Sequence, residues 1–269
     1  MSLITISGYM GCGVREIAQN VAKGLNLDIY DDQELLELAP KVGVLSEDLK
    51  ALGTPGFFSR LFRNKPQVYM DYMDAIIYEI SRRGEGIIIG HGSQILLQDF
   101  GCALHVRINA PEAARLETIR EQQELDVDVA RKLLQGTDSK QRKFCRLAFD
   151  MDFDNPDLYD LILNSAKIGY KTIATLVMDT ARAEEMAACS LTALEAMERL
   201  SILKRIQGAL LKNDLDDRLL TIDIVERGIV QVNGLSNDSE SVNRIIKTIE
   251  GVQGVQKVHS GLMISPPLY

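Results

Sequence analysis

Residues 3–22, LITISGYMGCGVREIAQNVA, decide the fold: an apolar run typical of a strand leads through a glycine-rich turn into an amphipathic helix. Gly8, Gly11 and Gly13 permit positive φ values, so that several backbone N–H groups can converge at the start of the helix. This geometry favours a bound phosphate. The stretch therefore predicts a phosphate-binding loop, with a glycine-rich turn that holds no ligand as the plainer alternative.

The loop departs from the GxxxxGK[ST] pattern of nucleotide-binding P-loops. Counted from Gly8, the second glycine is Gly13, Val14 takes the place of the lysine, and Arg15 takes that of the serine or threonine. The backbone cradle is kept, but the phosphate-binding lysine and the magnesium-binding hydroxyl are not. Arg15 is the expected substitute cation, because a guanidinium can bind two phosphate oxygens at once.

The composition excludes several classes of protein. The chain of 269 residues is long enough for one large or two modest domains, and its formal net charge of -8 argues against a nucleic-acid-binding surface. We expect neither a signal peptide nor a membrane span. The four cysteines form no C-x-x-C pair, which fits a reducing compartment better than a disulfide framework, and the scattered histidines make a zinc site improbable. We therefore expect a cytoplasmic protein.

Strands alternate with helices up to about residue 180, which predicts a parallel sheet with helices on both faces. Such sheets bind ligands at the carboxyl ends of their strands. Asp31 and Asp32 follow a short strand, and one of them could hold a substrate group or a magnesium-bound water, or could simply cap the next helix. His91 lies in a glycine turn after the apolar run 84–90, where it could donate to a phosphate or be merely solvated.

A densely charged region extends from residue 115 to residue 146. Kinases must neutralise the transferring phosphoryl group and exclude water, and a mobile basic lid closing over the phosphates would do both. A run of charges is nevertheless more often a solvated helix face. The candidate lid cations are Arg120, Arg131, Lys140, Arg142, Lys143 and Arg146.

Several of these motifs together resemble the cytidylate kinase-like family of P-loop nucleoside-monophosphate kinases. SGYMGCGVREIA (7–18) is similar to the family's loop, in which an arginine is normal, with Cys12 where a serine is usual and Val14 where a glycine is usual. His91 stands between two glycines where the family tends to have G-R-G, and GTDSKQRKF (136–144) carries the D-x3-R pair of the lid. NPDLYDLILNSAKIGY (155–170) is similar to the final strand, so the resemblance covers roughly residues 3–180.

The resemblance implies transfer of the γ-phosphoryl group of ATP, with magnesium, to CMP, dCMP or a similar acceptor. The residues that it suggests for catalysis are Arg15, Arg131, Asp138 and Arg142; those for nucleotide binding are Gly8, Gly11, Cys12, Gly13, Val14 and Arg15; and those around the acceptor are Asp31, Asp32, His91 and Arg120. No residue is assigned as a metal ligand. The segment 41–66 could cover the nucleoside monophosphate, although core cover is the favoured interpretation.

A non-catalytic nucleotide sensor is the rival hypothesis. It keeps the fold and the phosphate cradle, while Cys12, Val14 and His91 mark lost chemistry and the C-terminal module transmits the bound state.

The pattern changes from Ile202 onward. A helix, a hairpin that turns at 226–228, a second helix and a strand give the order α-β-β-α-β, which with V-x-V-x-G at 230–234 resembles a BON domain. We therefore expect a kinase-like domain over 1–198 and a BON-like domain over 199–269. Residues 201–269 hold eight basic and eight acidic residues, so a basic face for anionic lipids is not expected. A regulatory, ligand-sensing or oligomerising role is favoured, with a stabilising appendage as the plainer alternative.

Overall fold

The structure, a computed structural model, describes residues 2–43, 66–186, 188–215 and 217–264. The described residues form two compact units: unit 1 takes those of Met1–Glu34 and Arg83–Ala193, and unit 2 those of Leu35–Arg82 and Leu194–Tyr269. The expected boundary after residue 198 falls inside helix α10 (Leu191–Lys212), and the division at that point stays a proposal. Residues 44–65, which include most of the segment that could cover a nucleotide, lie outside the described residues.

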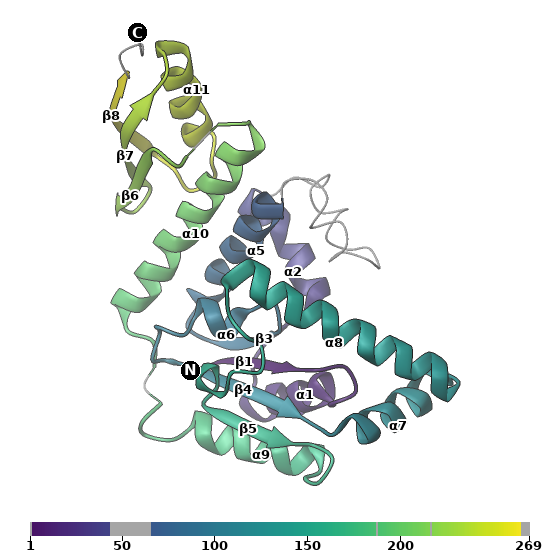
Figure 1. Ribbon diagram of the computed structural model, residues 1–269. Helices are drawn as coiled ribbons and strands as arrows, with labels where there is room; N and C mark the ends of the chain where they lie inside the picture. The colour runs from purple at the N-terminus through teal and green to yellow at the C-terminus, as the bar shows by residue number, and fades with distance from the viewer. Residues whose placement is uncertain (1, 44–65, 187, 216, 265–269) are drawn as a thin grey trace. The chain divides into compact units, whose positions relative to one another are not determined.

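Unit 1 is built on a five-stranded parallel sheet (Figure 1). Its strands are β1 (Leu3–Gly8), β2 (Ile29–Tyr30), β3 (Gly86–Ile89), β4 (Ala103–Asn109) and β5 (Leu161–Asn164), in the order β2-β3-β1-β4-β5. Strands β1, β3 and β4 are apolar and almost wholly buried, as expected for central strands of a sheet covered on both faces. The predicted fold class is confirmed.

Helices flank this sheet. They are α1 (Val14–Leu25), α6 (Ser93–Leu96), α7 (Glu112–Gln123), α8 (Val127–Phe149) and α9 (Tyr170–Ala181), with the short 3-10 turn η2 at Pro156–Leu158. Helix α1 packs against both α9 and the sheet (Figure 1). The charged region thus forms a hairpin of two helices, α7 and α8, held by a small apolar core of Ile119, Ala130 and Leu134.

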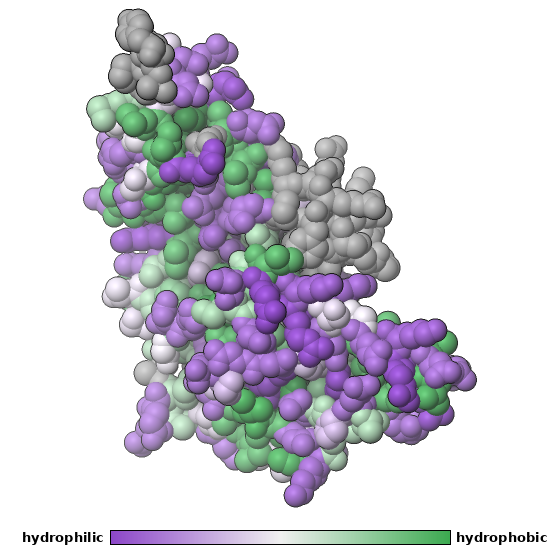
Figure 2. Space-filling view, viewed as in Figure 1, coloured by the Kyte–Doolittle hydropathy of each residue, from purple (hydrophilic) through white to green (hydrophobic). Residues whose placement is uncertain are grey.

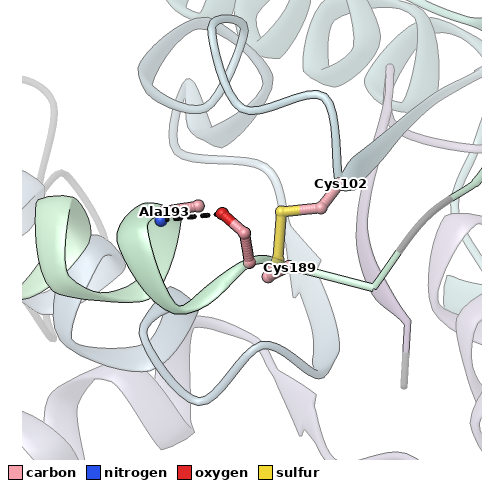
Figure 3. Close-up of a disulfide and its surroundings, with 4 residues drawn as sticks. Cys102, Cys189 and Ala193 are labelled. Atoms are coloured by element: carbon pink, nitrogen blue, oxygen red, sulfur yellow. Dashed lines mark hydrogen bonds between the residues drawn. A yellow bond between two sulfur atoms is a disulfide. The ribbon is translucent and has the colours of Figure 1, made fainter.

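A disulfide joins Cys102 and Cys189 within unit 1 (Figure 3). The expectation of a chain without disulfides is therefore wrong for this pair, while Cys12 and Cys145 are free and buried. The two bonded cysteines are 87 residues apart, and only the fold brings the segment before β4 beside the segment before α10. Ser190, next to Cys189, accepts a hydrogen bond from the Ala193 N–H and so caps the start of α10.

Unit 2 contains the predicted α-β-β-α-β order: α10, β6 (Leu220–Glu226), β7 (Ile229–Ser236), α11 (Ser239–Glu250) and β8 (Lys257–Ile264). Strand β7 pairs antiparallel with β6 and parallel with β8. Unit 2 also includes η1 (Ala39–Val42), helix α5 (Pro66–Ser81) and most of α2 (Asp32–Leu38), which begins in unit 1.

The core of unit 2 lies between the three-stranded sheet and its helices. Ile202, Ile206 and Leu210 of α10 meet Val230 and Val232 of β7, with further buried residues from β6 and α11. Several large apolar side chains of β6–β8 stay exposed, and Figure 2 shows hydrophobic side chains among hydrophilic ones over this part of the chain. Over the described ranges, no helix combines the length and apolar character needed to cross a membrane.

Candidate functional site

The glycine-rich loop lies at the carboxyl end of β1 and leads into α1. Gly11 and Gly13 have φ values of 83° and 75°, which residues with a side chain rarely adopt. Among the described residues, the N–H groups of Gly11, Gly13, Val14 and Arg15 have no acceptor. They lie at the start of a 12-residue helix, where unpaired donors and the helix dipole favour an anion.

Val14 and Cys12 contribute backbone rather than side chains to this loop. A Cβ atom at Gly8 would lie 2.6 Å from a methyl carbon of Val14 and 2.7 Å from the carbonyl oxygen of Ile108, so the Val14 side chain packs closely over Gly8. The Cys12 side chain is fully buried, and burial raises the pKa of its thiol. Neither side chain offers a phosphate the charge or hydroxyl of a standard P-loop.

Two acid–base pairs lie at the same edge of the sheet. Arg15 forms an ion pair with Asp31, and Nε2 of His91 lies 2.6 Å from Oδ1 of Asp32. The hydrogen bond with His91 is the main cause that lowers the pKa of Asp32. Burial opposes ionisation of Asp31, but its hydrogen bonds with Glu34 and with the Gln33 N–H, together with Arg15, lower its pKa. Both carboxylates are therefore ionised at neutral pH.

The turn that carries His91 has an unusual backbone. Gly90, His91 and Gly92 all have positive φ values, of 73°, 57° and 73°. For a residue with a Cβ this conformation costs about 1–2 kcal/mol. At Gly92 a Cβ would lie 2.2 Å from the Phe149 ring, so only glycine fits there. The turn directs the His91 imidazole toward Asp32.

A cluster of polar and aromatic side chains joins α8 to the loop. Nη1 of Arg142 lies 3.2 Å from the Tyr9 hydroxyl, which donates to Asp154 at 2.7 Å. Asp154 also forms an ion pair with Arg107, whose guanidinium carbon lies 3.8 Å from the ring centroid of Phe153. The chain of contacts holds Arg142 beside the residue that follows Gly8.

A buried ion pair supports the loop from the other side. Arg115 of α7 makes two hydrogen bonds with Asp138 of α8, at 3.0 and 2.8 Å, and donates to the carbonyl oxygen of Met10. Both side chains are less than one-tenth exposed. The Asp138 carboxylate is thus bound by Arg115, which also contacts the backbone of the loop at Met10.

The structure brings together only some of the predicted site residues. The loop from Gly8 to Arg15, with Gly11, Cys12, Gly13 and Val14, lies at one edge with Asp31, Asp32 and His91. Arg120 pairs with Glu117 along α7, and Arg131 lies exposed near the start of α8; within the described part of the chain, neither has a hydrogen bond or ion pair with the loop.

Sequence reasoning missed Tyr9, Arg107, Arg115 and Asp154. Arg107 lies between apolar residues in a strand sequence. A charged residue at such a position was the feature of the sequence that could have indicated a functional or structural role. A buried charge must be paired, and the parallel register places Arg107 directly beside Ser7, next to the loop. The partners themselves are 47 residues apart in sequence, which no local pattern reveals.

The parallel five-stranded sheet, the glycine-rich loop that ends β1 and the charged groups gathered around it define an α/β protein of the P-loop kinase type. A family model described as the cytidylate kinase-like family matches residues 3–167, more than half of the chain. The protein belongs to that family.

Individual relatives are distant. The cytidylate kinase of Methanocaldococcus jannaschii is 25% identical over 178 residues, which cover 65% of this chain and 94% of that protein. The cytidylate kinase of Halorubrum lacusprofundi is 25% identical over 186 residues, which cover 69% of this chain and 92% of that protein. The crystal structure of an uncharacterized protein from Eubacterium ventriosum has a TM-score of 0.54 at 15% identity, over 67% of this chain and 97% of that one. That likeness is one of fold alone.

Proposed function

We propose that the protein is a nucleoside-monophosphate kinase of cytidylate type, which transfers the γ-phosphoryl group of ATP to CMP, dCMP or a similar acceptor. The observation that carries the proposal is the placement of Arg142 beside a loop whose N–H groups have no acceptor among the described residues. Two relatives named cytidylate kinase, each matched over more than nine-tenths of its length, support the choice of acceptor.

In this proposal the backbone from Gly11 to Arg15 binds the phosphates of ATP. Arg142 neutralises charge on the transferring group, where a fixed cation stabilises the transition state more than the ground state. Tyr9 and Asp154 act on Arg142 and so position it. Asp138, which the resemblance suggests for catalysis, instead holds Arg115 behind the loop. Arg131 is proposed to contact the phosphates and Arg120 the acceptor when both substrates are bound.

Magnesium is implied by the family, and the donor set suits a metal that arrives with the nucleotide. Held with the nucleotide, it would supply charge neutralisation at the phosphates. Arg15 stands where a magnesium-binding hydroxyl is usual, but Asp31 and Asp32 provide ionised carboxylates at the same edge, suited to holding metal-bound water. In the described ranges no three His, Cys, Asp or Glu residues gather into a metal site, so phosphate and water oxygens would complete the coordination.

The direct test is a coupled phosphotransfer assay with ATP, magnesium and a panel of nucleoside monophosphates, beside a nucleotide-binding titration. Turnover is expected with CMP or dCMP. Arg142→Ala should lower kcat by about 100-fold with little change in ATP affinity, because its interaction is proposed to strengthen in the transition state. Lys132→Ala, an exposed cation on the same helix, is the matched control and should leave both values unchanged. Equal losses of turnover and affinity in Arg142→Ala would contradict its proposed role.

A nucleotide sensor is the second candidate. Two observations favour it: Val14 packs over Gly8 in place of a lysine, and Arg15 is already paired with Asp31. Tight nucleotide binding without turnover for any acceptor would establish the sensor and exclude the kinase.

The remaining parts of the proposal concern location and the C-terminal module. A cytoplasmic location follows from the ATP and nucleoside monophosphates that the proposed reaction consumes. A disulfide in that compartment is usually transient or redox-responsive, so Cys102 and Cys189 would be reduced part of the time. The module from residue 199 is proposed to be BON-like and to serve regulation or self-association. No nucleic-acid or membrane partner is proposed.

A further inference from the structure

A cavity of about 480 Å³ lies within unit 2. Its walls come from the last turns of α10 and α11 and from the segment that follows α11, with Tyr72 of α5 on one side. A water molecule occupies about 30 Å³, and sites for small organic molecules measure about 300–1,000 Å³. The cavity is therefore large enough for a metabolite rather than for a simple ion alone.

The walls of this cavity are basic. Arg205, Arg244 and Lys247 line it, and none of the described residues around it is acidic. Asn213 and Thr248 add neutral hydrogen-bonding groups. The chain as a whole carries a net charge of -8, so three cations around one cavity are a local departure that requires an explanation.

Arg205 forms the fixed part of the wall. Its guanidinium forms an ion pair with Glu79 at 2.6 Å and donates to the carbonyl oxygen of Gln253 at 3.1 Å. The residue is only 6% exposed. Its buried Nε–H has no acceptor in the part of the chain that the structure describes, whereas buried donors in native proteins are nearly always paired. Glu79 already balances the charge of Arg205, so the excess charge comes from α11.

Helix α11 turns one face toward the cavity. Ile245 and Ile249 pack into the core, which leaves Arg244, Lys247 and Thr248 together at the wall. Arg244 donates to the carbonyl oxygen of Asn213 at 3.1 Å. The Lys247 side chain has no hydrogen bond or ion pair with any described residue.

Part of this basic charge balances the helix ends. The carboxyl ends of α10 and α11 border the cavity, and each carries the equivalent of about half a negative charge. Together they offset about one of the two cations on α11. Asp238, at the start of α11, also interacts electrostatically with Arg244. The Lys247 side chain has no ion pair with a described residue, and it lies beside a cavity that can admit an anion.

We propose that this cavity binds a small phosphorylated metabolite, whose phosphate group lies between Arg244 and Lys247. A phosphate offers three oxygens to the two cations, to the Thr248 hydroxyl and to the Asn213 amide, and charge-assisted hydrogen bonds of this kind are the strong ones. The bound anion would join the carboxyl ends of α10 and α11, so occupancy would stabilise unit 2. The site would be separate from the phosphate loop of unit 1.

Hydrogen–deuterium exchange on the full chain tests this proposal, because it reports the two sites through different peptides. The probes are ribose 5-phosphate, CMP and pyrophosphate, with ribose and cytidine as uncharged partners and citrate as a carboxylate. The phosphorylated probes are expected to slow exchange in peptides that cover 205–213 and 244–253. The uncharged partners should leave these peptides unchanged.

The apparent Kd of the phosphorylated probes is obtained from the protection of those peptides. Lys247→Glu and Arg244→Glu should each raise it by at least about tenfold, which corresponds to about 1.4 kcal/mol. Lys257→Glu, an equal change of charge on β8 away from the cavity, should not. Protection of the loop around Gly8 by CMP or ATP should persist in all three variants, which separates this site from the proposed active site. Absence of protection with every phosphorylated probe, protection by citrate alone, or protection that survives both α11 variants would overturn the proposal.

Discussion

A buried group of charges in unit 2 leads to a prediction about stability and pH. Lys204 of α10 lies 3.1 Å from Asp71 and 3.2 Å from Asp74, both on α5. The two aspartates are 2% and 6% exposed, so one lysine faces two buried carboxylates. Burial is the main reason that the pKa of Asp74 rises from 3.8 to about 6; the charge of Asp71 adds to this effect and Lys204 opposes it.

The direction of the pH dependence follows from the number of protons that Asp74 binds in the folded and in the unfolded protein. Between about pH 4 and pH 6, Asp74 in the folded protein holds a proton that the unfolded chain has released. Its contribution to the free energy of unfolding is fully present below a pH of 3.8 and is lost as the pH rises through about 6. The whole effect amounts to about 3 kcal/mol, of which about 1 kcal/mol falls between pH 5 and pH 8.

Asp74→Asn removes the titrating group and keeps the shape of the side chain. The stability of the wild type relative to this variant should therefore fall by about 1 kcal/mol between pH 5 and pH 8. Urea unfolding followed by circular dichroism at a series of pH values measures this difference. Asp223→Asn, which removes an exposed carboxylate on β6, is the control and should follow the wild type. Parallel curves for the wild type and Asp74→Asn would refute the reasoning.

Three further predictions concern unit 1. Gly13→Ala should lower stability by at least about 1 kcal/mol, because Gly13 has a φ of 75° and a Cβ there would lie 2.3 Å from the Tyr170 ring. In thermal melts, adding Tyr170→Ala should restore only the part of the loss that comes from the collision with the ring. Asp138→Ala should cost about 3 kcal/mol in denaturant unfolding, since it leaves Arg115 buried without its partner; a cost near zero would contradict that role. Cys189→Ser should lower the melting temperature under oxidising conditions by removing a link across 87 residues, and should match the wild type in reductant.

Local patterns were sufficient for much of the site. The glycines of the first loop predict a phosphate cradle because their backbone freedom is a property of each residue alone. Asp31, Asp32 and His91 were expected at the sheet edge because parallel strands end on the same side, and the structure pairs Arg15 with Asp31 and His91 with Asp32. The specific pairs were not predictable, since they depend on side-chain geometry between neighbouring strands.

The charged region illustrates the limit of a sequence pattern. Its cations were equivalent candidates from their spacing, yet the structure places Arg142 beside Tyr9, leaves Arg131 exposed and uses Asp138 to hold Arg115. Which face of a long helix meets the loop depends on how α7 and α8 pack. That packing depends on the apolar contacts between the two helices and on the buried Arg115–Asp138 pair, and not on the exposed charges.

The sequence by itself determined the parallel sheet, the loop that ends β1 and the α-β-β-α-β order of the C-terminal region, because hydrophobic periodicity and turn residues act within a few positions of one another. Only the tertiary structure decided the Cys102–Cys189 bond, the cluster that joins Arg107 to Arg142 through Asp154, and the basic cavity of unit 2. Each of these joins segments far apart in the chain. Their meeting depends on long-range packing, on which local sequence carries no information.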